Sequence, residues 1–184
     1  MGTEDRVMPN YVNNILEIRS KNTEDIVNFI KQHYNEDGLF DFNTFVKEPE
    51  NEDECPSEYN MKLTSNDRSL EIFEDKPWFN WYDWRLKYWG TKWNCADESK
   101  CYFDLDKIRE CDSYFSPVYI HFTTAWTPPI PIFKKIFEMH PELDINIIYH
   151  STENMEYGWF VDVGKYVNFE EYRLTLVREE EITK

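Results

Sequence analysis

The chain has 184 residues, of which 36 are acidic and 20 basic, so its formal charge at neutral pH is -16. This length is typical of one domain with a full hydrophobic core. The charge argues against direct binding to nucleic acid or to an anionic membrane, because such surfaces hold phosphates with lysine and arginine. It permits an acidic surface that meets a basic partner, although a negative surface also keeps a protein soluble without any partner.

The sequence contains no sign of a membrane span, an export signal or a metal site. No apolar run approaches the roughly 20 residues that a membrane helix needs, and residues 1–7 lack the basic and apolar parts of a secretion signal. We therefore expect a cytoplasmic protein with reduced cysteines. Cys95, Cys101 and Cys111 lack the Cys-x-x-Cys spacing of zinc sites, and Cys55 is distant. We expect no metal and no cofactor.

The first part of the chain has the pattern of two strands around a helix. Residues 11–19 mix apolar and polar positions as a strand does. Thr23 is the expected N-cap of an amphipathic helix over residues 23–34, with two acidic residues in its first turn. Aromatic residues at alternate positions of 39–46 predict the second strand.

A long insertion, at about residues 47–113, follows these elements. Its beginning is acidic, with two prolines between residues 47 and 57, and predicts an exposed loop. Asp75 and Pro77 predict the entry of a helix that Gly90 ends. The end of the insertion is charged, and its pattern does not choose between helix and strand.

The last third of the chain has the clearest periodicity. Prolines at 128, 129 and 131 introduce a helix that His140-Pro141 closes. The predicted strands around and after this helix are residues 118–124, 143–150, 157–163 and 172–177.

Taken in order, the elements predict the α+β class. Strand, helix and strand come before the insertion, and strand, helix and strand come after it. This order predicts a ferredoxin-like (split βαβ) antiparallel sheet with helices on one face, a tryptophan-rich insertion and extra C-terminal strands. We expect one domain over residues 8–177, preceded by an extension at 1–7 and followed by an acidic tail at 178–184.

Several short motifs, scattered over residues 8–163, resemble those of one family. They are Met8-Pro9-Asn10 with Asn13-Asn14, Phe42-Asn43 to Val46 with Pro49-Glu50, Trp81-Tyr82-Asp83-Trp84 with Trp89 to Asn94, Thr124 to Pro129, and Glu156-Tyr157-Gly158. Together they resemble the YubB-like, ferredoxin-like family, found largely in phages and plasmids. The resemblance implies the fold and a mobile-element origin in a bacterial host cell, and no established activity. Residues 51–58 and 97–113 are more acidic than the family pattern, so a function peculiar to this chain could lie there.

The tryptophans give the first functional hypothesis. Five of the seven lie within residues 78–94, and Trp126 is a sixth. Because Trp, Tyr and Arg dominate protein–protein hot spots, we favour a non-enzymatic protein-binding domain. A tryptophan-rich helix packed onto the sheet is the structural alternative. A pocket for a nucleotide or another planar ligand is a further one, since rings stack on bases. The candidate binding residues are Trp81, Trp84, Trp89, Thr91, Lys92, Trp93, Asn94 and Trp126.

The acidic residues give a second hypothesis. Ordered carboxylates, with Glu52, Asp53 and Glu54 as candidates, could imitate nucleic-acid phosphates. The chain would then inhibit a basic host defence or DNA-handling protein, as anti-CRISPR or anti-restriction proteins do.

Catalysis is the weakest hypothesis. The spacing of Asp83, Asp97 and Asp104 puts them on no common face. The histidines at 121, 140 and 150 show no ligand spacing, and with five glycines the chain has no phosphate-binding glycine-rich loop.

Overall fold

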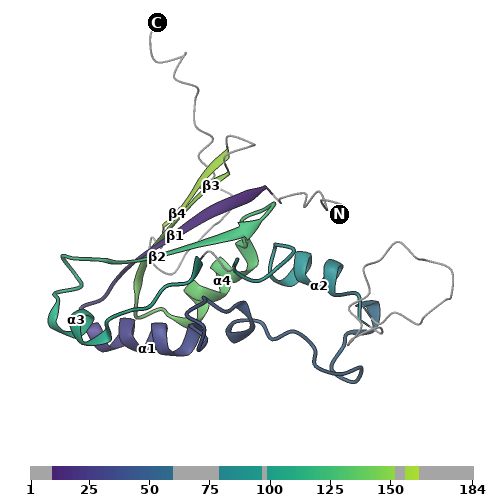
Figure 1. The fold of residues 1–184 in the computed structure, drawn as a ribbon, viewed down its shortest axis with the longest axis horizontal. Coiled ribbons are helices and arrows are strands. Elements are labelled where there is room, and N and C mark those ends of the chain that lie inside the picture. The colour runs from purple at the N-terminus through teal and green to yellow at the C-terminus, as the bar shows by residue number, and fades with distance from the viewer. Residues whose placement is uncertain (1–9, 60–78, 97–98, 152–155, 162–184) are drawn as a thin grey trace, which may run out of the picture.

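The computed structural model describes residues 10–59, 79–96, 99–151 and 156–161. A four-stranded antiparallel sheet forms its centre (Figure 1). Its strands lie in the order β2-β1-β3-β4. Their bounds are Tyr11–Arg19 for β1, Val118–Ala125 for β2, Asp144–Ser151 for β3 and Glu156–Val161 for β4.

Strand β1 lies between the two strands of a βαβ unit. Both β2 and β3 pair antiparallel with β1, so they run parallel to each other on either side of it. They are connected by helix α4, which spans Ile130–Met139. This arrangement is the split βαβ unit of ferredoxin-like folds, and it confirms the predicted α+β class. The helix ends before His140-Pro141, as predicted.

The strand predicted over residues 39–46 is wrong. Only Phe40 forms a β-bridge there, with Tyr34, and the chain then turns into the 3-10 helix η1, Phe42–Thr44. The carboxylate of Asp41 accepts a hydrogen bond from the Asn43 amide and starts this turn. The position beside β3 is taken instead by β4, from the far end of the sequence. Residues 172–177, the other expected C-terminal strand, lie outside the described residues.

Helix α1 spans Thr23–His33, close to its predicted range. Its N-cap is Asn22 rather than Thr23, because the Asn22 side chain accepts the hydrogen bond from the Glu24 amide. Asn and Thr are both good N-caps, so residue type alone could not decide between Asn22 and Thr23.

The insertion contains short helices. Helix α2 spans Trp81–Tyr88 and is capped by Asn80. It ends at Gly90, as predicted, where a positive φ of 80° suits glycine. The entry predicted at Asp75 and Pro77 is too early in the chain, because Asn80 caps the helix and its first residue is Trp81. A 3-10 helix, η2, spans Ser57–Tyr59, and helix α3 spans Leu105–Glu110.

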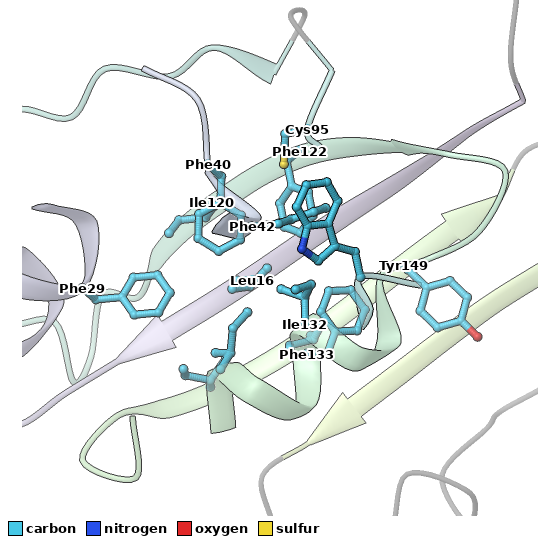
Figure 2. Packing of buried hydrophobic residues seen from close by; sticks show 14 of the residues in the cluster. Leu16, Phe29, Phe40, Phe42, Cys95, Ile120, Phe122, Ile132, Phe133 and Tyr149 are labelled. Atoms are coloured by element: carbon cyan, nitrogen blue, oxygen red, sulfur yellow. The ribbon is translucent and has the colours of Figure 1, made fainter. Parts of the chain in front are cut away.

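The helices α1 and α4 cover one face of the sheet and leave the other open (Figure 1). On β1, for example, every second residue from Val12 to Ile18 is buried, whereas the residues between these positions are partly or fully exposed. Figure 2 shows Leu16 in this core. Aromatic rings such as that of Phe42 lie on one side of it, and Ile132 and Phe133 of α4 lie on the other. The predicted one-sided covering is therefore confirmed. Among the described residues, no helix has the length and apolar content needed to cross a membrane.

We predict that Leu16→Ala lowers the free energy of unfolding by about 2–5 kcal/mol, because it opens a cavity under the central strand. Urea denaturation measures this loss. Ile148→Ala is the control: this side chain lies exposed on the open face of the sheet, so the change should cost well under half as much. Equal losses would contradict the assignment of the two faces.

Candidate functional site

Three tryptophans of the insertion are part of the hydrophobic core. Trp81, Trp84 and Trp89 are buried, although they belong to the candidate binding residues. The Trp84 and Trp89 rings meet edge to face, with centroids 5.6 Å apart. The Trp89 ring also meets Phe42 edge to face, and its Nε1 donates a hydrogen bond to the Val46 carbonyl at 2.9 Å. These rings therefore fasten α2 to the segment after α1.

An ion pair within this aromatic cluster joins α2 to the same segment. The guanidinium of Arg85 donates from Nε and Nη2 to the two carboxylate oxygens of Glu48, at 2.9 and 2.8 Å. Its centre lies 5.1 Å from the Trp81 ring centroid and 5.0 Å from that of Trp89. The side chains of the pair are only 16% and 12% exposed. This bidentate geometry favours Arg over Lys.

The turn after α2 contacts the end of β2 through threonine hydroxyls that donate to main-chain carbonyls. Thr91 is buried, and its hydroxyl donates to the Ala125 carbonyl at 2.8 Å. In return, the Thr127 hydroxyl donates to the Gly90 carbonyl at 2.6 Å. A Cβ on Gly90 would lie 2.5 Å from Cδ of Pro131, so the turn packs directly on the first turn of α4.

Trp126 lies at this junction, yet its ring does not join the core. The side chain is 45% exposed, so the two tryptophan stretches meet through backbone and threonine hydrogen bonds rather than through indole rings. Its φ is 70°, a left-handed conformation that bulky residues rarely adopt. The Trp126 amide donates to the Asn10 carbonyl at 2.7 Å, and this bond helps to hold the conformation.

Other rings are exposed on the outer side of α2 and the turn after it. Tyr82 and Leu86, one helical turn apart, are 39% and 38% exposed, and Trp93 is 36% exposed. The ammonium of Lys92 lies 4.5 Å from the Trp93 ring centroid and 6.0 Å from that of Tyr82. We call the set Tyr82, Leu86, Lys92, Trp93 and Trp126 the aromatic surface.

Asn94, another candidate binding residue, is engaged in internal hydrogen bonds. Its Oδ1 accepts from the Phe42 amide at 3.0 Å, and its Nδ2 donates to the Asp41 carboxylate at 2.7 Å. It therefore holds the beginning of η1 against the turn after α2.

The three candidate acidic residues form an exposed, ordered turn. Asn51 Oδ1 accepts from the amides of Asp53 and Glu54 at 3.1 and 3.2 Å. The Glu54 carboxylate in turn accepts from Asn51 Nδ2 and from the Glu50 amide. Glu52 and Asp53 are exposed, so the turn presents their carboxylates to solvent.

The aspartates considered for catalysis have structural partners. Asp83 accepts a hydrogen bond from Asn80 at the start of α2. Asp104 caps α3, and the hydrogen bond from the Lys107 side chain lowers the pKa of its carboxyl. Asp97 lies outside the described residues. Within the described part of the chain, no three His, Cys, Asp or Glu side chains converge as metal ligands.

The sequence reasoning did not identify Arg85, Glu48, Tyr82 or Leu86. For Tyr82 and Leu86 a signal existed, since their spacing places both on the helix face away from Trp81 and Trp84. For the ion pair, the partners lie 37 positions apart in the sequence, so no local pattern indicates the contact.

We predict that Glu48→Gln lowers the free energy of unfolding by about 1–3 kcal/mol, because it leaves a partly buried guanidinium without its counter-charge. Urea denaturation measures the loss. The control is Glu50→Gln, which removes the same charge from a pair with Lys47 that is more than 60% exposed. That change should cost less than about 0.5 kcal/mol. Equal costs would show that the Arg85 pair adds nothing beyond surface electrostatics.

Comparison with known proteins agrees with the fold. Residues 88–162 match the family model described as the ferredoxin-like domain in Api92-like protein. The match begins at the last residue of α2 and includes β2, α4, β3 and β4. No curated protein and no solved structure matches the chain. The split βαβ unit and the strand after it are therefore similar to the ferredoxin-like domain of Api92-like proteins, and the chain has a ferredoxin-like α+β fold.

Proposed function

We propose that the chain is a non-enzymatic protein-binding domain and that the aromatic surface contacts its partner. The observation that carries this proposal is Trp126, a large ring that is both exposed and held at a positive φ. A left-handed conformation costs a bulky residue about 1–3 kcal/mol, and exposure of 45% of the side chain forgoes part of the gain from burying the ring. A partner that covers the ring would recover the part of its surface that the fold leaves exposed.

The chemistry of the aromatic surface supports a protein partner. Tyr and Trp are the residues most enriched at binding hot spots, and Lys92 places a cation between two exposed rings. The buried rings of Trp81, Trp84 and Trp89 hold the surface on a rigid base. Because these three rings are packed against the core, they favour a contact surface over a tryptophan-lined pocket for a planar ligand.

The resemblance to the YubB-like family supports the biological setting. We include in the proposal that the domain is encoded by a phage or another mobile element and works in the cytoplasm of a bacterial host. A host protein is then the natural partner.

We predict that Trp126→Gly and Trp93→Ala each weaken binding by about 2 kcal/mol or more, roughly thirtyfold in Kd. Glycine adopts a positive φ without strain, so the first change removes the ring and keeps the turn. The full chain is immobilised, a bacterial lysate is passed over it, and the retained protein is purified for titration calorimetry.

Phe115→Ala is the matched control for this experiment. Phe115 is 77% exposed but lies outside the aromatic surface, in the loop before β2. A partner that binds all three variants as it binds the wild type would refute the proposed surface, and retention of no protein would count against a binding function.

A second candidate function is mimicry of nucleic acid. The specific observation in its favour is the ordered acidic turn at residues 50–54, which presents exposed carboxylates to solvent. Within the described residues, neither Glu52 nor Asp53 forms an ion pair with a lysine or an arginine. In this case the partner is a basic DNA-handling or defence protein, and binding is steered by charge.

The mimicry hypothesis predicts that the double change Glu52→Lys with Asp53→Lys weakens binding strongly, and that raised salt weakens it too. The chain offers a close control. Asn35-Glu36-Asp37 repeats the sequence Asn51-Glu52-Asp53 and forms the same turn, with Asn35 Oδ1 accepting from the Asp37 amide at 3.0 Å. Reversal of Glu36 and Asp37 changes the net charge equally. If both double variants lose affinity to the same extent, only net charge matters and the acidic turn is no mimic.

A further inference from the structure

Four side chains form a hydrogen-bonded row where α1 and α4 end. His33 is the last residue of α1, and His140 is the C-cap of α4. Their Nε2 atoms lie 2.7 Å apart. On the far side of each ring, His33 Nδ1 lies 2.7 Å from the Thr44 hydroxyl, and His140 Nδ1 lies 3.0 Å from the Glu142 carboxylate. His33 is fully buried and His140 is 7% exposed, so protein groups rather than solvent decide their protonation.

The position of each hydrogen follows from the partners. The Thr44 hydroxyl must donate to the Asp41 carbonyl, 2.6 Å away, because a carbonyl only accepts. Its oxygen is then left to accept from His33 Nδ1. At the other end, a carboxylate only accepts, so His140 Nδ1 must donate to Glu142. The short contact between the two Nε2 atoms needs one further hydrogen, which makes three on the four ring nitrogens.

We propose that His33 and His140 form a buried imidazole–imidazolium pair, with Glu142 as its counter-ion, and that this pair is a pH-sensitive clamp between the ends of α1 and α4. Two neutral rings carry only two hydrogens, so they cannot make all three contacts while Glu142 is ionised. Two charged rings carry four hydrogens and would direct two N–H groups at each other. Only the state with one charged and one neutral ring has the three hydrogens that the three contacts need.

The charge belongs on His140. Burial, helped by the charge of His140, lowers the pKa of His33 to about 3, so His33 stays neutral. His140 has the carboxylate of Glu142 beside it and caps the C-terminal end of α4, where the helix dipole favours a cation.

Within the described residues, aromatic rings surround the pair. The Phe45 ring stacks on His33 with centroids 3.9 Å apart, and Phe29 contacts both imidazoles. Phe40 meets the edge of His33. Asp41 faces the row with its carbonyl, while its carboxylate accepts from Asn43 and Asn94.

The sign of the pH dependence follows from His33. In the unfolded chain His33 takes up a proton near pH 6.5, whereas in the folded chain it does so only near pH 3. The unfolded state therefore binds more protons in this window, and stability falls as the pH drops below about 6.5. The clamp should thus weaken as the pH falls below about 6.5.

Nitrogen-detected NMR of the histidine side chains tests the proposal directly, because the full chain has only four histidines. At neutral pH we expect both nitrogens of His140 to carry hydrogen and His33 to show one protonated and one bare nitrogen, with Nδ1 protonated. In Glu142→Gln the amide can donate to His140 Nδ1, so His140 should become neutral with a bare Nδ1. Glu138→Gln, which removes an exposed charge of α4 paired with Lys135, should leave the spectrum unchanged.

A bare nitrogen on His140 in the wild type at neutral pH would overturn the proposal, as would an unchanged His140 spectrum in Glu142→Gln. A second measurement follows stability from pH 8 to pH 5 by urea denaturation. His33→Gln should flatten the decline below about pH 6.5, whereas His150→Gln, which changes a histidine on the open face of the sheet, should not. If the glutamine variant of His33 fails to fold, the wild-type spectrum still decides.

Discussion

Strand β1 pairs along almost its whole length with β2 on one side and β3 on the other, and all other packing in the domain depends on this position. Because side chains alternate along a strand, Val12, Leu16 and Ile18 define a single buried face. Helices α1 and α4 are amphipathic and can bury their apolar sides only there. The tryptophan-rich insertion then covers the remaining edge of the same core, through rings that come from a region far away in the sequence.

The periodic parts of the chain could be predicted from the sequence. Alternation predicted β1, β2 and β3, and the prolines at 128, 129 and 131 with His140-Pro141 predicted the limits of α4 closely. These signals are local, so a short window of sequence contains them. The strand prediction for residues 39–46 was wrong because the aromatic residues of this segment also alternate, as they do in strands. Phe40 and Phe42 are both buried. A turn that starts at Asp41, rather than pairing in the sheet, directs their rings into the core.

The role of the tryptophan-rich segment in the core was predictable, but the orientation of each ring was not. The density of tryptophans correctly indicated that α2 is an anchor of the architecture, yet it could not tell core rings from surface rings. Trp84 is buried and Trp93 is partly exposed because the helix turns one toward Phe79 and the following turn directs the other outward. Two features depend on partners that lie more than 100 positions apart in the sequence. They are the conformation of Trp126 and the hydrogen-bonded row between α1 and α4, and no local pattern could predict them.

The close approach of Gly90 to Pro131 has a consequence for how such a chain can change over time. The insertion and the βαβ unit touch here with no room for a methyl group, and the backbone of Gly90 is left-handed as well. Any larger residue at this position would push α4 away from α2 unless the proline ring were lost at the same time. The two positions therefore constrain each other, and an evolving lineage could exchange the insertion for another only if the new segment brought a glycine to this contact or Pro131 changed with it.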